Sequence, residues 1–68
     1  MVSSRRPIDP IAQAQARVLV TELERVADSL VAALDTGVGG EKALRTARRE
    51  LYETREHVRR LQHAYELP

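Results

Sequence analysis

The stretch TGVGG (residues 36–40) decides the fold of this 68-residue chain, because it is the one strong break between two long helical patterns. No Gly or Pro lies between Pro10 and Gly37, and none lies between Gly40 and Pro68. Gly37 suits the left-handed conformation that commonly follows the last residue of a helix. The stretch therefore predicts a turn over residues 36–40 with a helix on each side.

The first helix is predicted over residues 10–35 and the second over residues 41–66. The Asp9 carboxylate can accept the free backbone amides of a helix start. Pro10 suits the first helical position, because the amide it lacks would be unpaired there. At the second start, the charge of Glu41 is favourable near a helix N-terminus. Two equal helices joined by a short loop are typical of an antiparallel hairpin.

The fold class predicted from these segments is all-α. Residues 10–68 form a single helical-hairpin domain in this interpretation. Residues 1–9 precede the helical pattern, and with Arg5 and Arg6 they are predicted to be a flexible basic N-terminal arm.

Apolar residues recur in both segments at alternating spacings of four and three, which is the pattern of a coiled-coil or bundle seam. The seam residues are Ala12, Ala16, Leu19, Leu23, Val26, Leu30 and Ala33 in the first helix and Leu44, Ala47, Leu51, Thr54, Val58, Leu61 and Tyr65 in the second. Folding the chain at the turn pairs Ala33 with Leu44 and Ala12 with Tyr65. Small residues then face large ones, which is how facing helices interdigitate.

Two helices alone cannot enclose a core, and a chain this short seldom gains more than about 3–5 kcal/mol from one core. We therefore expect the hairpin to associate, first of all as a homodimeric four-helix bundle. The glycine-rich turn also permits an open form in which each chain is one continuous helix.

A candidate partner-binding face lies beside the predicted seam. On the first helix it consists of aliphatic residues, and on the second it is a stripe of arginines with one tyrosine. These residues are Val20, Ala27, Val31 and Leu34 on the first helix and Arg45, Arg48, Tyr52, Arg55 and Arg59 on the second. Arg and Tyr are enriched at the centres of protein interfaces. The sequence thus predicts a non-enzymatic adaptor, regulator or accessory subunit that docks a second protein with a helical or acidic surface.

The same face has a plainer interpretation as a solvated surface. Glu24 and Asp28 could pair with the arginines, while arginine stems lie over Val20 and Ala27.

Nucleic acid is the rival partner. The arginine stripe could follow phosphates and Tyr52 could stack on a base. The predicted hairpin resembles, in shape and size, the small plasmid RNA-binding hairpins of the Rop type, with no shared motif. The isoelectric point near 8.3 is low for a nucleic-acid-binding domain. We therefore rank this alternative second.

Enzyme chemistry is not expected. The chain has no cysteine, and its glycine-rich stretch follows a helix rather than a strand, unlike a nucleotide-binding loop. His57 and His63 lie six residues apart, so they occupy different helix faces. The sequence predicts no catalytic, cofactor or metal site. The longest apolar run, residues 30–34, is too short to span a membrane, so a cytoplasmic protein is expected.

Overall fold

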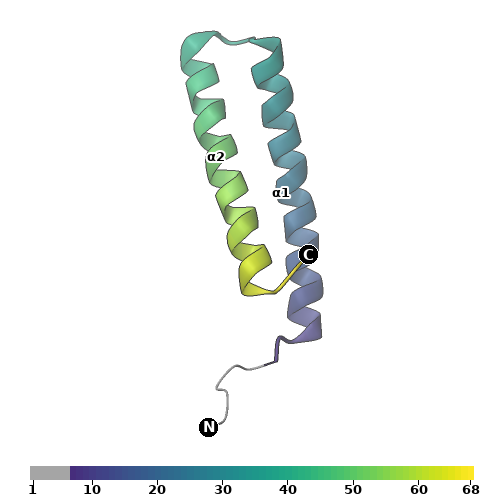
Figure 1. Ribbon diagram of the computed structural model, residues 1–68. Helices are drawn as coiled ribbons and strands as arrows, with labels where there is room; N and C mark the ends of the chain where they lie inside the picture. The colour runs from purple at the N-terminus through teal and green to yellow at the C-terminus, as the bar shows by residue number, and fades with distance from the viewer. Residues whose placement is uncertain (1–6) are drawn as a thin grey trace.

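The protein is an antiparallel pair of helices joined by a short turn, as the computed structural model shows for residues 7–68 (Figure 1). Helix α1 covers Pro10–Thr36 and helix α2 covers Gly40–Ala64. Residues 1–6 of the predicted basic arm lie outside the described residues. The predicted all-α hairpin is confirmed.

The start of α1 is set by its capping residue. The Asp9 backbone is extended, and its Oδ1 accepts a hydrogen bond of 3.0 Å from the amide of Ile11. Pro10 occupies the first turn, where its missing amide costs nothing. Both features agree with the sequence-based expectation.

The turn between the helices depends on glycine. Gly37 ends α1 with φ of 66°, and its amide donates to the Ala33 carbonyl at 3.2 Å. Gly39 has φ of 101° and precedes α2 without a side-chain cap. A Cβ placed on Gly39 would lie 2.9 Å from the Cβ of Ala43. Position 39 therefore requires glycine for both its backbone conformation and the space beside Ala43. Because α1 ends at Thr36 and α2 begins at Gly40, the turn is shorter than the predicted five residues.

Helix α2 ends two residues before the predicted position 66, because the chain turns back in a Schellman motif. Glu66 adopts φ of 53°, and the amide of Leu67 donates to the Gln62 carbonyl at 2.8 Å. Nearby, Gln13 Nε2 of α1 donates to the Tyr65 carbonyl at 3.0 Å. This long-range bond ties the free end of α2 to the start of α1.

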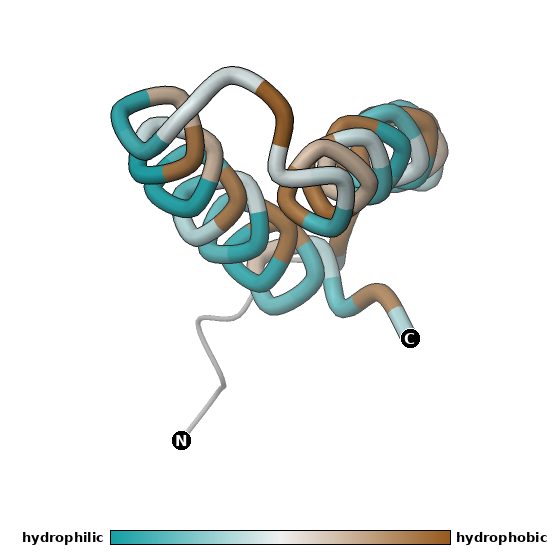
Figure 2. Tube along the Cα trace, turned by 90° about the horizontal axis from the view of Figure 1, so that it is seen from above, coloured by the Kyte–Doolittle hydropathy of each residue, from teal (hydrophilic) through white to brown (hydrophobic). Residues whose placement is uncertain are grey.

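The helix–helix contact is thin. Among the described residues, the buried apolar side chains are Ala16, Val20, Ala27 and Leu51, and none is fully enclosed. The α2 seam follows the predicted heptads, because Leu51 is buried and its other six members are half-buried. Figure 2 shows α2 hydrophilic on its outer side and hydrophobic toward α1.

The α1 seam differs from the prediction. Leu19 and Val26, predicted to face α2, are 41% and 46% exposed, whereas Val20 and Ala27 are only 7% and 9% exposed. The packed row alternates at spacings of four and three as regularly as the predicted one. Its members are Ala16, Val20, Leu23, Ala27, Leu30 and Leu34. Periodicity alone therefore could not choose between the two rows.

In this orientation of α1, its packed row lies near the C-terminal turn as well as near α2. Leu67, brought back by the C-terminal turn, lines the same shallow hollow as Val20. Ala27 lines one groove together with Val58 and Arg55 of α2. The register along the hairpin is close to the predicted one, because Ala12, Ala16, Leu61 and Tyr65 line one hollow.

Candidate interaction surface

The arginine stripe is a continuous exposed surface of α2. Helical spacings of three and four place its members along one side of the helix. It consists of Arg45, Arg48, Tyr52, Arg55 and Arg59, all of them exposed. The Tyr52 side chain is 64% exposed. The structure thus presents the polar half of the predicted face to solvent.

Most arginines of the arginine stripe have no carboxylate as an ion-pair partner in the part of the chain that the structure describes. Arg59 forms an ion pair with Glu56, one turn earlier on the same helix. Between residues 7 and 68, Arg45, Arg48 and Arg55 form no ion pair. Like charges one helical turn apart repel mildly. An external anionic group would relieve this repulsion.

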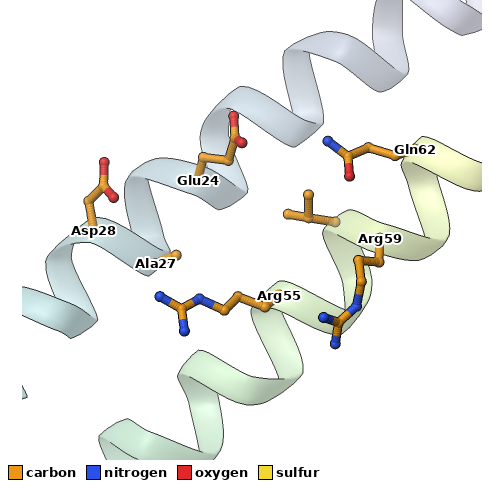
Figure 3. A pocket seen from close by; sticks show the side chains of 7 residues that line it. Glu24, Ala27, Asp28, Arg55, Arg59 and Gln62 are labelled. Carbon is orange, nitrogen blue, oxygen red and sulfur yellow. The ribbon is translucent and has the colours of Figure 1, made fainter. Parts of the chain in front are cut away.

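A groove runs between the arginine stripe and α1 on this side of the hairpin (Figure 3). It encloses about 480 Å³ and is lined by Glu24, Ala27, Asp28, Arg55, Val58, Arg59 and Gln62. The acids lie on the α1 wall and the arginines on the α2 wall. Within residues 7–68, neither Glu24 nor Asp28 forms an ion pair with the stripe. The groove is therefore open and carries opposite charges on its two walls.

The aliphatic half of the predicted face is not a free surface. Val20 and Ala27 are buried against α2, and Val31 and Leu34 are half-buried. Val20 and Ala27, predicted to lie beside the seam, instead belong to it, because α1 turns this row toward α2. Of these residues, Ala27 lines the groove together with Arg55 and Arg59.

A different apolar row of α1, which the sequence analysis assigned to the seam with α2, is left partly uncovered. We call Ala12, Leu19, Val26 and Ala33, which recur every seven residues, the open row. Leu19 and Val26 are exposed, and Leu19 lines a hollow of about 160 Å³ with Leu61 and Tyr65. The open row therefore lies on the side of the hairpin opposite the charged groove. The sequence contains both heptad rows, but their equal periodicity does not show which of them α2 covers.

A second basic hollow lies near the start of α2. It encloses about 280 Å³ and is lined by Lys42, Arg45, Thr46 and Arg49. Arg45 belongs to both this hollow and the arginine stripe, so the positive surface widens toward the turn. No acidic residue lines it.

No other chemical site emerges from residues 7–68. That part of the chain contains no cluster of three His, Asp or Glu side chains able to hold a metal ion. It also contains no helix long and apolar enough to cross a membrane. The two features that stand out are thus both surfaces, one basic and one apolar. No known family, curated protein or solved structure matches this chain.

Proposed function

We propose that this protein is a small non-enzymatic interaction module, an adaptor, regulator or accessory subunit that docks an acidic surface of a second protein. The observation that carries the proposal is the arginine stripe. Three of its arginines are exposed and have no ion-pair partner in the described residues. An acidic helix or loop would supply the missing carboxylates in bidentate geometry.

The stripe has the composition of an interface centre. Tyr52 offers a broad apolar ring with a hydrogen-bonding tip, flanked by Arg48 and Arg55 one turn away on either side. Aromatic and arginine side chains contribute most to binding when they become fully desolvated. The groove beside Arg55 gives a partner side chain room to enter.

The proposed module acts as a homodimeric four-helix bundle. The hairpin leaves Leu19 and Val26 exposed, and no described side chain is fully enclosed. Isolated domains of this size are marginal unless a partner or a cross-link adds stability. A second copy would complete the core and leave the arginine stripe free for another protein.

The alternative is a Rop-like RNA- or DNA-binding hairpin. The basic hollow of Lys42, Arg45 and Arg49 favours it, since this hollow continues the stripe with no acidic lining residue. Phosphate binding of this kind falls steeply as the salt concentration rises. Salt dependence therefore separates the two functions.

Binding measurements with defined probes test the proposal. The probes are a fluorescent helical peptide rich in Glu, a short RNA hairpin and a single-stranded DNA, each titrated at low and physiological salt. Arg48→Ala with Arg55→Ala removes two stripe charges. Arg17→Ala with Arg60→Ala removes the same charge from exposed positions outside the stripe.

We expect the acidic peptide to bind, the stripe variant to weaken it about tenfold or more, and the control variant to leave it nearly unchanged. Equal losses for both variants would contradict a role for the stripe. RNA or DNA binding that is lost with the stripe and falls steeply with salt would instead favour the alternative.

A further inference from the structure

We infer that a second copy of this chain packs on the open row and is related to the first copy by a two-fold axis. The axis passes over both helices of the hairpin, at the level of Leu23 on α1 and of Thr54 on α2. This inference rests on the proposed dimer and specifies which face it uses and how the copies are oriented. The axis lies in the interface, perpendicular to the helices. The two turns would therefore sit at opposite ends of the bundle.

The first reason is that α1 carries two seams. Ala16, Leu23 and Leu30 are shared by the row that packs on α2 and by the row predicted from the heptads. The first row continues through the buried Val20 and Ala27, and the second through the exposed Leu19 and Val26. A helix with an apolar face this wide is typical of a bundle, in which each helix contacts two neighbours. The hairpin supplies α1 with one neighbour only.

The second reason is that the open row is complementary to itself. Its residues lie symmetrically about a point between Glu22 and Leu23, with alanine at both ends and the larger side chains in the middle. An antiparallel second copy of α1 would therefore set Leu19 against the partner's Val26. The same operation sets Ala12 against the partner's Ala33. Isologous interfaces of two-fold dimers require this kind of symmetry.

The third reason is that α2 has the same symmetry on the same side of the hairpin. Leu61 and the open-row residue Leu19 line one hollow, which places both on that side. Positions 47, 54 and 61 are half-buried and lie symmetrically about Thr54. An antiparallel copy would set Ala47 against the partner's Leu61, and Thr54 against the partner's Thr54.

A second row of α2 adds polar complementarity. Its members recur every seven residues and are exposed: Ala43, Glu50, His57 and Ala64. The same axis sets Glu50 against the partner's His57, so that a carboxylate meets an imidazole twice across the interface. It also sets Ala43 against the partner's Ala64.

The two helices agree on the position of the axis. Ala12, Ala16, Leu61 and Tyr65 line one hollow, and the Gln13–Tyr65 hydrogen bond closes the same end of the hairpin. Continued along the helices, this register sets Leu23 level with Thr54. On this register the centre of symmetry of α1 and that of α2 lie near the same level of the hairpin. One axis satisfies both helices.

The other closed arrangement has its two-fold axis parallel to the helices, and it pairs unlike groups. It would set Leu19 against the partner's His57, and Val26 against the partner's Glu50. Apolar side chains would then cover a charged group without a partner, which is costly. The perpendicular axis instead sets apolar residues against apolar ones and polar residues against polar ones.

Charge and area are consistent with the perpendicular axis. Glu22 would approach the partner's Glu22, but each Glu22 already pairs with Arg25 at 3.0 Å, so this level is electrically balanced.

The face of two helices, each about 40 Å long and ~10 Å wide, is about 800 Å². That is the area each partner contributes to a stable protein interface of standard size.

Cysteine cross-linking tests the axis, because the natural chain has no cysteine. Glu22→Cys and Thr54→Cys each place a single thiol near the axis, where it would meet its own copy. Asp28→Cys is the control, because this exposed residue lines the groove on the opposite side. Glu50→Cys mixed with His57→Cys tests a pair displaced from the axis. Each sample is oxidised, with and without a short bis-maleimide, and analysed on a non-reducing gel.

We expect the Glu22→Cys and Thr54→Cys bands to shift from one chain mass to two, and the Asp28→Cys band to remain at one. Glu50→Cys and His57→Cys should cross-link mainly when mixed. Circular dichroism checks that each variant folds. Glu22 is exposed, so Glu22→Cys keeps the test decisive if Thr54→Cys unfolds the hairpin.

Light scattering of the unmodified protein separates the inference from the proposal on which it rests. A mass of one chain, 7.7 kDa, would overturn both the dimer and the axis. A mass of two chains without cross-linking at Glu22 or Thr54, or with preferential cross-linking at Asp28, would overturn the axis alone. A mass of two chains with cross-linking at both axial positions would support it.

Discussion

Asp9, Gly37 and Gly39 set where the helices begin and end, and each acts through its backbone environment. Asp9 accepts an otherwise unpaired amide hydrogen bond at the start of α1. Gly37 and Gly39 adopt positive φ values, which side chains disfavour. These effects are local, and for that reason they are readable from the sequence.

The two turn glycines should differ in their tolerance of alanine. No atom lies within 4 Å of a Cβ at position 37, so Gly37→Ala should cost only the left-handed strain, about 1–2 kcal/mol. Gly39→Ala adds a clash with Ala43 at 2.9 Å and should cost about 1–3 kcal/mol more. Urea unfolding followed by circular dichroism measures both. Equal costs would mean that the turn relaxes to relieve the clash.

The N-cap of α1 should contribute measurably to stability. Asp9→Ala removes the acceptor of the Ile11 amide, and we expect a loss of about 1 kcal/mol in the free energy of unfolding. Asp9→Asn keeps a side-chain oxygen at that position and serves as the control, with little loss expected. If both variants were equally destabilised, the negative charge rather than the cap would be responsible.

At the scale of the element, α1 and α2 differ in how much apolar surface they carry. Helix α2 has one seam, with the arginine stripe on its exposed side. Helix α1 has two overlapping seams, and α2 covers only the one that includes Val20 and Ala27. The rotation of α1 is therefore the feature that assigns one row to the interior and the other to the surface.

Alanine substitution at two neighbouring valines tests that rotation. Val20 is 7% exposed, so Val20→Ala should lower the free energy of unfolding by about 2 kcal/mol through lost burial and a small cavity. Val18 is 65% exposed, and Val18→Ala should change stability by less than ~0.5 kcal/mol. Chemical denaturation of both variants gives the comparison. A larger loss at Val18 would contradict the orientation of α1.

At the scale of the whole molecule, the two sides of the hairpin differ in character. The charged groove lies on one side, and the open row lies on the other. The hairpin buries few side chains, so its stability as a single chain should be at the low end for domains. The proposed bundle would use the apolar side for self-association and leave the charged side for a partner.

Introducing a charge into the open row should dissociate the proposed dimer. Leu19→Glu would place a carboxylate opposite an apolar side chain of the second copy, and we expect the mass measured by light scattering to fall from two chains to one. Val18→Glu adds the same charge to a neighbouring exposed position of α1 and should leave the mass unchanged. A dimer that persists in Leu19→Glu would show that the open row is not the dimer interface.

Sequence alone determined the two helices, the turn and the exposed arginine stripe. Asp9, Pro10 and Gly37 act within one helical turn of their own positions, so their effects do not depend on the rest of the fold. The α2 seam was also predictable, because this helix carries one apolar row.

The tertiary structure decided which row of α1 faces α2. Two rows of equal periodicity share Ala16, Leu23 and Leu30, so the heptad pattern could not distinguish Leu19 from Val20. The Schellman turn was likewise not predicted, and it returns Leu67 to the hollow lined by Val20. Both outcomes depend on contacts between residues far apart in the chain, and periodicity within one helix carries no information about such contacts.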